Sequence, residues 1–305
     1  MSFLTIFSAP KPFDRLHISI IQRNAIRSWI ELGKEVEVIL LGDESGIAET
    51  AREFGVRHIA EIKRNSQGTP LLDSIFDLAA ENSDSPVLAY LNSDILVLPN
   101  FLNTAREVSQ QTKEYLIVGQ RWDLDITREL DFSSGWQAGL WRNCQENGRL
   151  HPRGGSDYFI YPRGAFQNMP AFALGRAGWD NWMIYEGRKR GWKVIDATSS
   201  VDIIHQTHDY NHLPDGKPHY KLPESFDNLR MAGGKQVIFT LNDANSIIEK
   251  GQVKLQPVTW TKFWREVEIF PLLSLNSNLL AQVFYRIFHP VKTMKEVRVW
   301  LVKFK

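Results

Sequence analysis

The sequence contains very little cysteine: Cys144 is the single one among 305 residues. An intrachain disulfide is therefore excluded, and the chain is not a disulfide-stabilised secreted domain. It also lacks an apolar run long enough to cross a bilayer. The N-terminus lacks the pattern of a signal peptide, because Lys11 and Asp14 follow only a short apolar run. We therefore expect a cytoplasmic protein.

The chain also lacks an excess of charge of either sign. It has 36 Lys and Arg against 35 Asp and Glu, a net charge of +1. This balance argues against a dedicated nucleic-acid binder, so we expect no nucleic-acid partner. Several signature motifs are missing too. No Gly-x-Gly-x-x-Gly follows the first predicted strand and no Walker A sequence occurs, which leaves dinucleotide and P-loop sites unsupported. No Gly-x-Ser-x-Gly supports a hydrolase triad.

What is present is a regular alternation of short apolar runs with segments of helical periodicity. Hydrophobic residues make up 43% of the chain, enough for a substantial core. We expect strands at residues 3–8, 36–41, 56–62, 87–91, 115–119, 157–162 and 192–197, and helices at 16–32, 47–54, 69–81, 100–111 and 175–190. Residues 131–155 read as loop-rich and polar. The alternation predicts an α/β fold with a mostly parallel sheet and helices on both faces.

The most informative stretch is residues 86–100, P-V-L-A-Y-L-N-S-D-I-L-V-L-P-N. A buried strand is predicted to end in Asn92, Ser93 and Asp94, and a second apolar run follows at once. A carboxylate at the end of a buried strand lies at the edge of a sheet, where α/β folds bind their ligands. An ordinary strand-to-loop junction would favour the same three residue types.

A cluster of histidines supplies candidate metal ligands. His205 and His208 are followed closely by Asp209 and His212. Hard divalent cations prefer carboxylate oxygens and accept imidazole, so one Asp with one or two His suits an ion held mainly by a substrate diphosphate. A closed structural zinc site would need more Cys or His ligands. A polar loop with hydrogen-bonded histidines remains the alternative.

Asp180 stands between Trp179 and Trp182 at the predicted start of a helix. Aspartate is favoured there simply because it suits a helix N-terminus. An aromatic wall would also desolvate the carboxylate and raise its proton affinity, as a general base requires. Six of the ten tryptophans fall in the middle third of the chain, a density that suits either a core or a sugar-binding cleft.

Several of these segments resemble the GT-A glycosyltransferases, the nucleotide-diphospho-sugar transferases. Asn92-Ser93-Asp94 after a strand resembles their Asp-x-Asp motif, with Asn92 where the first Asp usually stands. Residues 9–13 (A-P-K-P-F), 175–182 (G-R-A-G-W-D-N-W) and 205–210 (H-Q-T-H-D-Y) resemble a little-characterised group within this superfamily. The resemblance covers about residues 1–245 and implies a GT-A-like, mixed but mostly parallel sheet.

The resemblance also implies roles. It makes Asp94 a ligand of a divalent metal, Mn²⁺ or Mg²⁺, with His205 or His208 completing the site, and Asp180 the catalytic base. It places the nucleotide-sugar donor against Ser8, Ala9, Pro10, Asp43, Asn65, Gly68, Thr69, Asn92 and Ser93. We expect Arg121, Asp157, Trp179, Asn181 and Asp209 around the sugar or the hydroxyl-bearing acceptor, for instance a carbohydrate. The implied activity is metal-dependent glycosyl transfer.

Three other functions compete with this one. A non-catalytic protein that binds a sugar or nucleotide on the same fold is supported by the missing first carboxylate. A sugar-nucleotide pyrophosphorylase has a similar sheet, but the Gly-rich, Arg-containing loop expected after the first strand is absent. A metal hydrolase built on the histidines would need no nucleotide, so nucleotide binding separates it from a transferase.

The composition changes near the C-terminus. We expect a catalytic domain at residues 1–250, with a nucleotide-binding half to about 125 and an acceptor half beyond it, and a helical extension at 251–305. Between Arg286 and Lys305 six basic residues stand against one acid, Glu296. A basic amphipathic end can lie on an anionic membrane surface. A terminal helix pair packed on the domain, with a solvated basic face, is the alternative that we favour.

Overall fold

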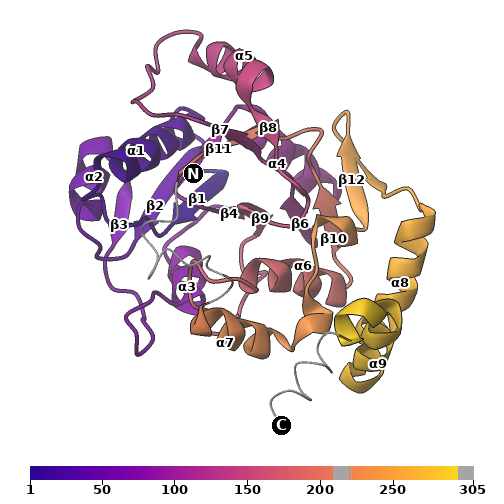
Figure 1. Ribbon diagram of the computed structural model, residues 1–305. Helices are drawn as coiled ribbons and strands as arrows, with labels where there is room; N and C mark the ends of the chain where they lie inside the picture. Colours follow the sequence, from indigo (N-terminus) through magenta and orange to yellow (C-terminus); the bar gives the residue numbers. More distant parts are fainter. Residues whose placement is uncertain (209–219, 221, 295–305) are drawn as a thin grey trace.

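The computed structural model describes residues 1–208, 220 and 222–294 (Figure 1). Among these residues, nine strands form the main sheet in the order β13-β12-β10-β6-β9-β4-β1-β2-β3. Their bounds are β1 (Leu4–Ser8), β2 (Val36–Leu41), β3 (Arg57–Ile59), β4 (Val87–Leu91), β6 (Tyr115–Val118), β9 (Tyr158–Pro162), β10 (Lys193–Asp196), β12 (Ser246–Glu249) and β13 (Gln252–Leu255). β9 and β13 run antiparallel to their neighbours, and the other pairs are parallel.

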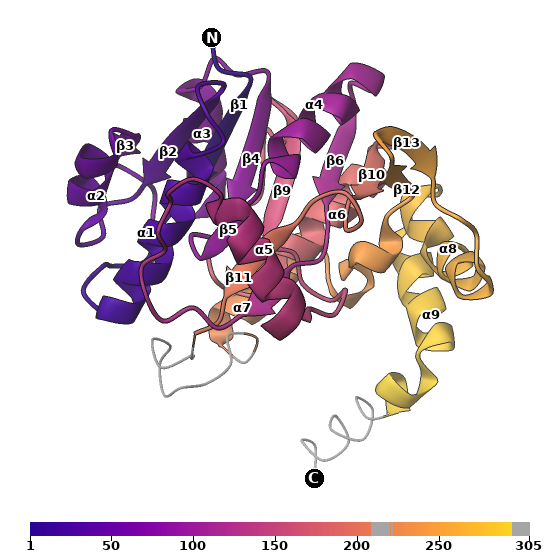
Figure 2. The ribbon, with the colours of Figure 1, turned by 90° about the horizontal axis from the view of Figure 1, so that it is seen from above.

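Helices cover both faces of this sheet, as the alternation predicts (Figures 1 and 2). They are α1 (Leu16–Ile30), α2 (Ile47–Phe54) and α4 (Asn100–Gln111) on one face, and α3 (Leu72–Glu81), α6 (Trp179–Lys189) and α7 (Pro223–Ala232) on the other. Side chains of a strand point alternately to the two faces. In β1, Ile6 accordingly packs with Trp29 of α1, whereas Phe7 packs with Phe76 of α3. The predicted fold class is confirmed.

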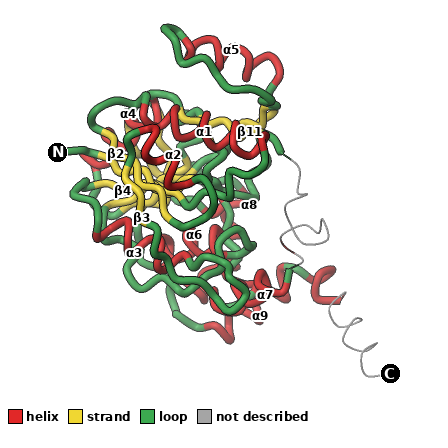
Figure 3. Tube along the Cα trace, turned by 90° about the vertical axis from the view of Figure 1, so that its left-hand side faces the viewer, coloured by secondary structure: helices red, strands yellow, loops and turns green. Residues whose placement is uncertain are grey.

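A second sheet of four strands, β5-β11-β7-β8, lies beside the main one. It contains β5 (Ile95–Val97), β7 (Trp122–Leu124), β8 (Arg149–Leu150) and β11 (Ile203–Gln206), and α5 (Trp136–Asn147) covers it. Figure 3 shows α5 projecting from the body of the molecule. The expectation of an irregular segment at residues 131–155 is therefore wrong. The helix is short of apolar residues, but Leu140 and Cys144, four positions apart, share its buried side.

Two more helices, α8 (Trp260–Leu273) and α9 (Asn278–Phe288), pack against each other near one end of the main sheet (Figure 1). Ile269, Leu272 and Ala281 are buried and join them to the core. The helix pair expected at the C-terminus is therefore present and packed on the domain. No helix in the described part of the chain is long and apolar enough to cross a membrane.

The boundaries of the elements differ from the expected ones in places. α3 begins at Leu72 rather than at residue 69, because Arg64 and Pro70 form a bridge and Leu71 pairs with Ala173. The segment that carries the histidines contains β11, a strand that the sequence analysis does not predict, and residues 209–219 lie outside the described part. The proposed division near residues 125 and 250 stays a prediction. Strands from both sides of residue 125 belong to one sheet.

Candidate metal and nucleotide-sugar site

The topology gathers several chain segments at one edge of the main sheet. β1 and β4 are parallel, so their carboxyl ends, Ser8 and Leu91, lie at the same edge. β9 is antiparallel to β4 and pairs its first residue, Tyr158, with Leu91, so Asp157 enters at this edge too. Open α/β sheets bind their ligands at the edge formed by the carboxyl ends of their parallel strands.

The turn after β4 is held by polar contacts on several sides. The backbone N–H of Ile95 donates to the carbonyl of Asn92 (3.1 Å), which closes the turn. The Ser93 hydroxyl donates to Oε1 of Gln22 in α1 (2.8 Å), and that oxygen also accepts from the backbone N–H of Lys11 (2.7 Å). The Gln22 side chain thus accepts hydrogen bonds from both the loop after β1 and the turn after β4.

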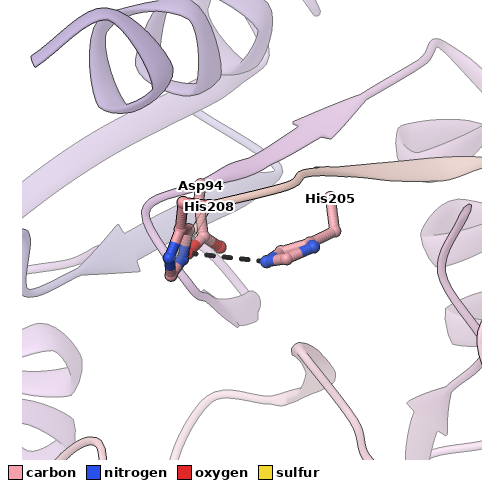
Figure 4. Close-up of side chains that lie close together, drawn as sticks. All are labelled: Asp94, His205 and His208. Carbon is pink, nitrogen blue, oxygen red and sulfur yellow. Dashed lines mark hydrogen bonds and ion pairs between the residues drawn. The ribbon is translucent and has the colours of Figure 1, made fainter. Parts of the chain in front are cut away.

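Asp94 faces two histidines across the junction of the two sheets (Figure 4). Its Oδ2 lies 3.1 Å from Nε2 of His208 and 3.9 Å from Nε2 of His205. β11 supplies His205 and pairs antiparallel with β5, which places His205 opposite Ile95. Ligand atoms of the three residues lie within 4.8 Å of one another. The structure thus brings together the three residues that the sequence predicts as metal ligands.

The cluster also fits the electrostatic requirements of a cation site. Asp94 is 8% exposed, and its Oδ1 is buried without a hydrogen-bond partner among the described residues. An unpaired buried carboxylate oxygen is costly unless it meets a charge. Burial alone would raise the pKa of Asp94, but His205 and His208 hold it well below its ordinary value. The carboxylate is therefore charged and has a coordination position free.

Lys11 adds a positive charge beside this carboxylate. Burial lowers the pKa of the Lys11 ammonium below its ordinary value, and the charge of Asp94 opposes that effect. An ammonium at the edge of a metal site can neutralise anionic groups of a ligand. Lys11 belongs to segment 9–13, and its role beside Asp94 cannot be predicted from the sequence alone.

Asp123 holds His205 from the side opposite Asp94. It pairs with His205 in the register of the parallel strands β7 and β11, and its Oδ1 lies 3.1 Å from Nδ1 of His205. A carboxylate on the second ring nitrogen fixes the tautomer and orientation of a ligating histidine. Burial alone would raise the pKa of Asp123. Hydrogen bonds from His205 and His151 outweigh burial and lower the pKa below its ordinary value. Sequence reasoning missed this residue.

Arg121 links Asp123 to Asp157. Its Nε donates to Oδ1 of Asp123 (2.9 Å), and its Nη1 donates to Oδ2 of Asp157. Oδ1 of Asp157 accepts from Nδ2 of Asn92 (2.9 Å), and the Asn92 backbone N–H donates to the Asp157 carbonyl (3.0 Å). Asn92, Arg121 and Asp157, all predicted site residues, thus form one network with the turn that carries Asp94.

Asp180 lies in the first turn of α6 and is partly buried. Burial raises the pKa of Asp180 to about 6, and the charge of Asp157 adds to the rise. Hydrogen bonds from the backbone of Asn181 and Gly178 oppose it. The carboxyl is therefore poised to exchange a proton near neutral pH.

Trp179 and Asn181, the neighbours of Asp180, make structural contacts. The Trp179 ring packs edge-on against Tyr90 of β4 at 5.2 Å between centroids and is buried. Nδ2 of Asn181 donates to the carbonyl of Phe239 (2.6 Å). Both contacts fix the start of α6. Asp209, the remaining residue predicted near the sugar or acceptor, lies outside the described residues.

The residues predicted for the nucleotide fall into two groups. Ser8, Ala9 and Pro10 follow β1 next to the turn, and the Ser8 hydroxyl donates to the Leu91 carbonyl (2.6 Å). Asp43 lies farther along the sheet, after β2. It pairs with Arg64 and lines a hollow of about 540 Å³ with Glu44, Gly46 and His58.

The loop at residues 63–71 is bound to α7. Nδ2 of Asn65 donates to Oε1 of Glu224 (2.6 Å), and Nε of Arg176 donates to Oε2 of the same side chain (2.6 Å). Within the loop, the Thr69 N–H donates to Oδ1 of Asn65 (3.0 Å), and the Gly68 carbonyl accepts from Arg64 (3.0 Å). Among the residues described, this loop and Asp43 are joined by hydrogen bonds and ion pairs to Glu224, Arg176 and Glu44 rather than to Asp94 or His205.

No family model matches the sequence, and no curated protein matches it. The structure is similar to that of a mannosyltransferase from Pyrobaculum calidifontis in complex with GDP-Man and Mn²⁺, with a TM-score of 0.45 and 9% identity over 68% of this chain and 58% of that one. It is also similar to GalNAc-T7 with UDP, GalNAc and Mn²⁺, with a TM-score of 0.47 and 14% identity over 75% of this chain and 48% of that one. This chain therefore covers less than two thirds of the length of either protein.

Proposed function

We propose that this protein is a metal-dependent glycosyltransferase that moves a sugar from a nucleoside-diphospho-sugar to an acceptor hydroxyl. The observation that carries the proposal is the cluster of Asp94, His205 and His208 at the carboxyl edge of β4, with one oxygen of a charged, buried carboxylate unpartnered. A carboxylate with two imidazoles leaves coordination positions for the oxygens of a diphosphate.

The proposed cofactor is a divalent cation, Mn²⁺ or Mg²⁺, held by Asp94, His205 and His208. When bound, such an ion offsets the negative charge of a departing diphosphate. The chain's own residues would do the remaining work. Asp123 orients His205 through its 3.1 Å contact with Nδ1, and Lys11 adds positive charge beside Asp94.

We propose that the donor lies along the carboxyl edge of β1, β4 and β2. Ser8, Ala9, Pro10, Asn92 and Ser93 would contact its diphosphate and ribose. The hollow beside Asp43 is large enough for a base, and the loop containing Asn65, Gly68 and Thr69 would approach it from the α7 side.

Asp180 would act as the base. A carboxyl with a pKa of about 6 is mostly ionised at pH 7 and still basic enough to take a proton from a hydroxyl. In the transfer, the acceptor oxygen bonds to the anomeric carbon and the bond from that carbon to the diphosphate breaks. The acceptor proton passes to the Asp180 carboxylate. Arg121 and Asp157 would shape the acceptor side, and Trp179 and Asn181 would hold Asp180 in place.

The decisive experiment is a thermal-shift screen of nucleoside diphosphates and sugar nucleotides, each with and without Mn²⁺. A ligand that binds the folded state raises the unfolding temperature by mass action. We expect a shift that requires both metal and nucleotide and that disappears in Asp94→Asn. Asp84→Asn is the matched control, because Asp84 is exposed before the opposite end of β4. A shift that survives Asp94→Asn would contradict the proposed metal site.

A second function, sugar or nucleotide binding without turnover, is favoured by one observation. Asn92 offers no carboxylate to the metal, and its amide is already engaged by Asp157. Metal-dependent release of nucleoside diphosphate from a sugar nucleotide would exclude this alternative. For either function we propose a cytoplasmic location, since the buried thiol of Cys144 needs no oxidising compartment.

A further inference from the structure

The C-terminal helix pair exposes large apolar side chains on both of its helices. We call them the α8–α9 face, which comprises Trp260, Phe263 and Trp264 of α8 and Leu279, Leu280, Val283 and Ile287 of α9. Trp260 is 73% exposed, Leu279 74% and Ile287 64%. A monomeric protein seldom leaves this many large apolar side chains of neighbouring helices in water without a partner.

Aromatic rings cluster on α8 and contact the end of α9. Trp260 lies 5.8 Å from Phe263 and 5.5 Å from Trp264, measured between ring centroids. Trp264 in turn lies 6.2 Å from Phe288 at the end of α9. Along α9 the exposed residues recur at one to four positions, which puts them on a single side of the helix.

The buried side of the same helices is separate. Ile269 and Leu272 of α8 and Ala281 of α9 pack on the core. Helices α8 and α9 are therefore attached to the domain by one side and carry a second apolar side outward. The outward side keeps ring contacts within the helix pair but leaves most of Trp260, Leu279 and Ile287 exposed.

The basic groups next to this face carry positive charge. Arg286 and Lys292 form no ion pair with any residue that the structure describes. By contrast, Lys262 pairs with Glu266 and Arg265 pairs with Asp243, so the basic groups of α8 are neutralised. The sequence that follows Lys292 adds Lys295, Arg298, Lys303 and Lys305 against Glu296.

We propose that the α8–α9 face docks the protein on the surface of an anionic lipid bilayer. Tryptophan and phenylalanine rings are favoured at the boundary between headgroups and acyl chains, and nearby Lys and Arg attract anionic headgroups. A second copy of this chain is disfavoured on the same face, because it would bring Arg286 and Lys292 of both copies together. This inference is independent of the proposed enzymatic function.

The test is flotation of the full-length protein with vesicles of phosphatidylcholine alone and of phosphatidylcholine mixed with phosphatidylglycerol. We expect binding to the mixed vesicles only, weakening as salt is added. Replacing both Trp260 and Ile287 by serine should abolish binding. Arg286→Gln should weaken it about fivefold, the effect of one basic residue near such a surface.

Leu16→Ser is the matched control, because Leu16 is 78% exposed at the start of α1, far from the helix pair. Each variant is checked by its unfolding temperature, which exposed substitutions should leave unchanged. Equal binding to both kinds of vesicle, or to neither, overturns the proposal. A concentration-dependent dimer that the Trp260 and Ile287 replacements dissociate would assign the face to a second copy and overturn it as well.

Discussion

Nδ1 of His205 lies 3.1 Å from Oδ1 of Asp123, while Nε2 of the same ring faces Asp94 at 3.9 Å. The His205 imidazole thus lies between two carboxylates that come from different parts of the chain. Asp123 belongs to β7, and Asp94 lies in the turn before β5. The contact with Asp123 fixes which nitrogen is turned to the cluster, as in the carboxylate–histidine pairs that support metal ligands.

From this geometry we predict that Asp123→Ala weakens Mn²⁺ binding about 10- to 100-fold, because His205 loses the group that orients it. Titration calorimetry with Mn²⁺ and a nucleoside diphosphate measures the effect. Asp125→Ala serves as the control, since Asp125 is exposed two residues away. Equal metal affinity in the two variants would show that His205 needs no orienting partner.

The second prediction concerns the activity of Asp180→Asn. Asparagine keeps the size of the side chain but cannot take up the acceptor proton. Turnover should fall on the order of a hundredfold to ten-thousandfold with little change in donor affinity. In the unmodified protein, turnover should rise with pH through about 6, where the Asp180 carboxyl loses its proton. Near-normal turnover in the variant would remove Asp180 from the mechanism.

The same residue gives a prediction on stability. Because the pKa of Asp180 is raised to about 6 in the folded protein, the folded state holds a proton that the unfolded state releases at lower pH. Stability contributed by this group therefore falls as pH rises from about 4 to 6. Asp180→Asn should accordingly be more stable than the unmodified protein at pH 7, by about 1–3 kcal/mol, and equally stable near pH 4. Urea unfolding at the two pH values measures it.

The fourth prediction concerns the stability of Asn92→Asp. Its amide donates to Oδ1 of Asp157 at 2.9 Å, so Asn92→Asp would place two carboxylates in contact. Loss of the hydrogen bond and repulsion between the charges should destabilise the protein by about 1–3 kcal/mol at pH 7. The loss should shrink in acid, as one carboxyl becomes protonated. Urea unfolding at pH 7 and near pH 4 measures the effect. An unchanged free energy of unfolding at pH 7 would contradict the prediction.

The fifth prediction concerns Glu224, which binds both Asn65 and Arg176. Burial would raise the pKa of Glu224, but hydrogen bonds from its partners lower it, so its carboxylate stabilises the fold above its ordinary pKa and loses that effect in acid. Glu224→Ala leaves the guanidinium of Arg176 without this partner and should cost about 3–5 kcal/mol. It should also weaken nucleotide binding, since the loop at residues 63–71 loses its anchor.

Glu224→Gln is the informative companion, because it keeps an oxygen for one hydrogen bond and removes only the charge. It should lie between the unmodified protein and Glu224→Ala in both stability and nucleotide affinity. If Glu224→Ala binds nucleotide normally in a thermal-shift assay, the loop has no part in the donor site.

The sequence was sufficient for the parts of this protein that local patterns determine. The apolar run from Val87 to Leu91 predicts a buried strand, and the polar triplet that follows places Asp94 at the end of that strand. The density of histidines in the sequence points to His205 and His208. By contrast, Asp123 is recognisable only from the pairing of β7 with β11, two strands that are remote in sequence.

Other features of the structure cannot be predicted from residue types alone. α5 buries little besides Leu140 and Cys144, so its helical pattern was weak. The density of tryptophans suits either a core or a sugar-binding cleft, and Trp179, Trp182 and Trp192 are buried in the core on one face of the sheet. A tryptophan that binds a sugar and a tryptophan that packs in the core look the same in the sequence. Only the tertiary structure shows which role a given tryptophan has.

The separation of Asp94 and His208 by 114 positions has a consequence for biogenesis. The two side chains meet only after β5 has paired with β11, so neither half of the chain can capture the proposed ion alone. During synthesis the site cannot exist until His208 has left the ribosome. The proposed ion could therefore bind only after the chain has been made through His208, so it would not template the folding of the first strands.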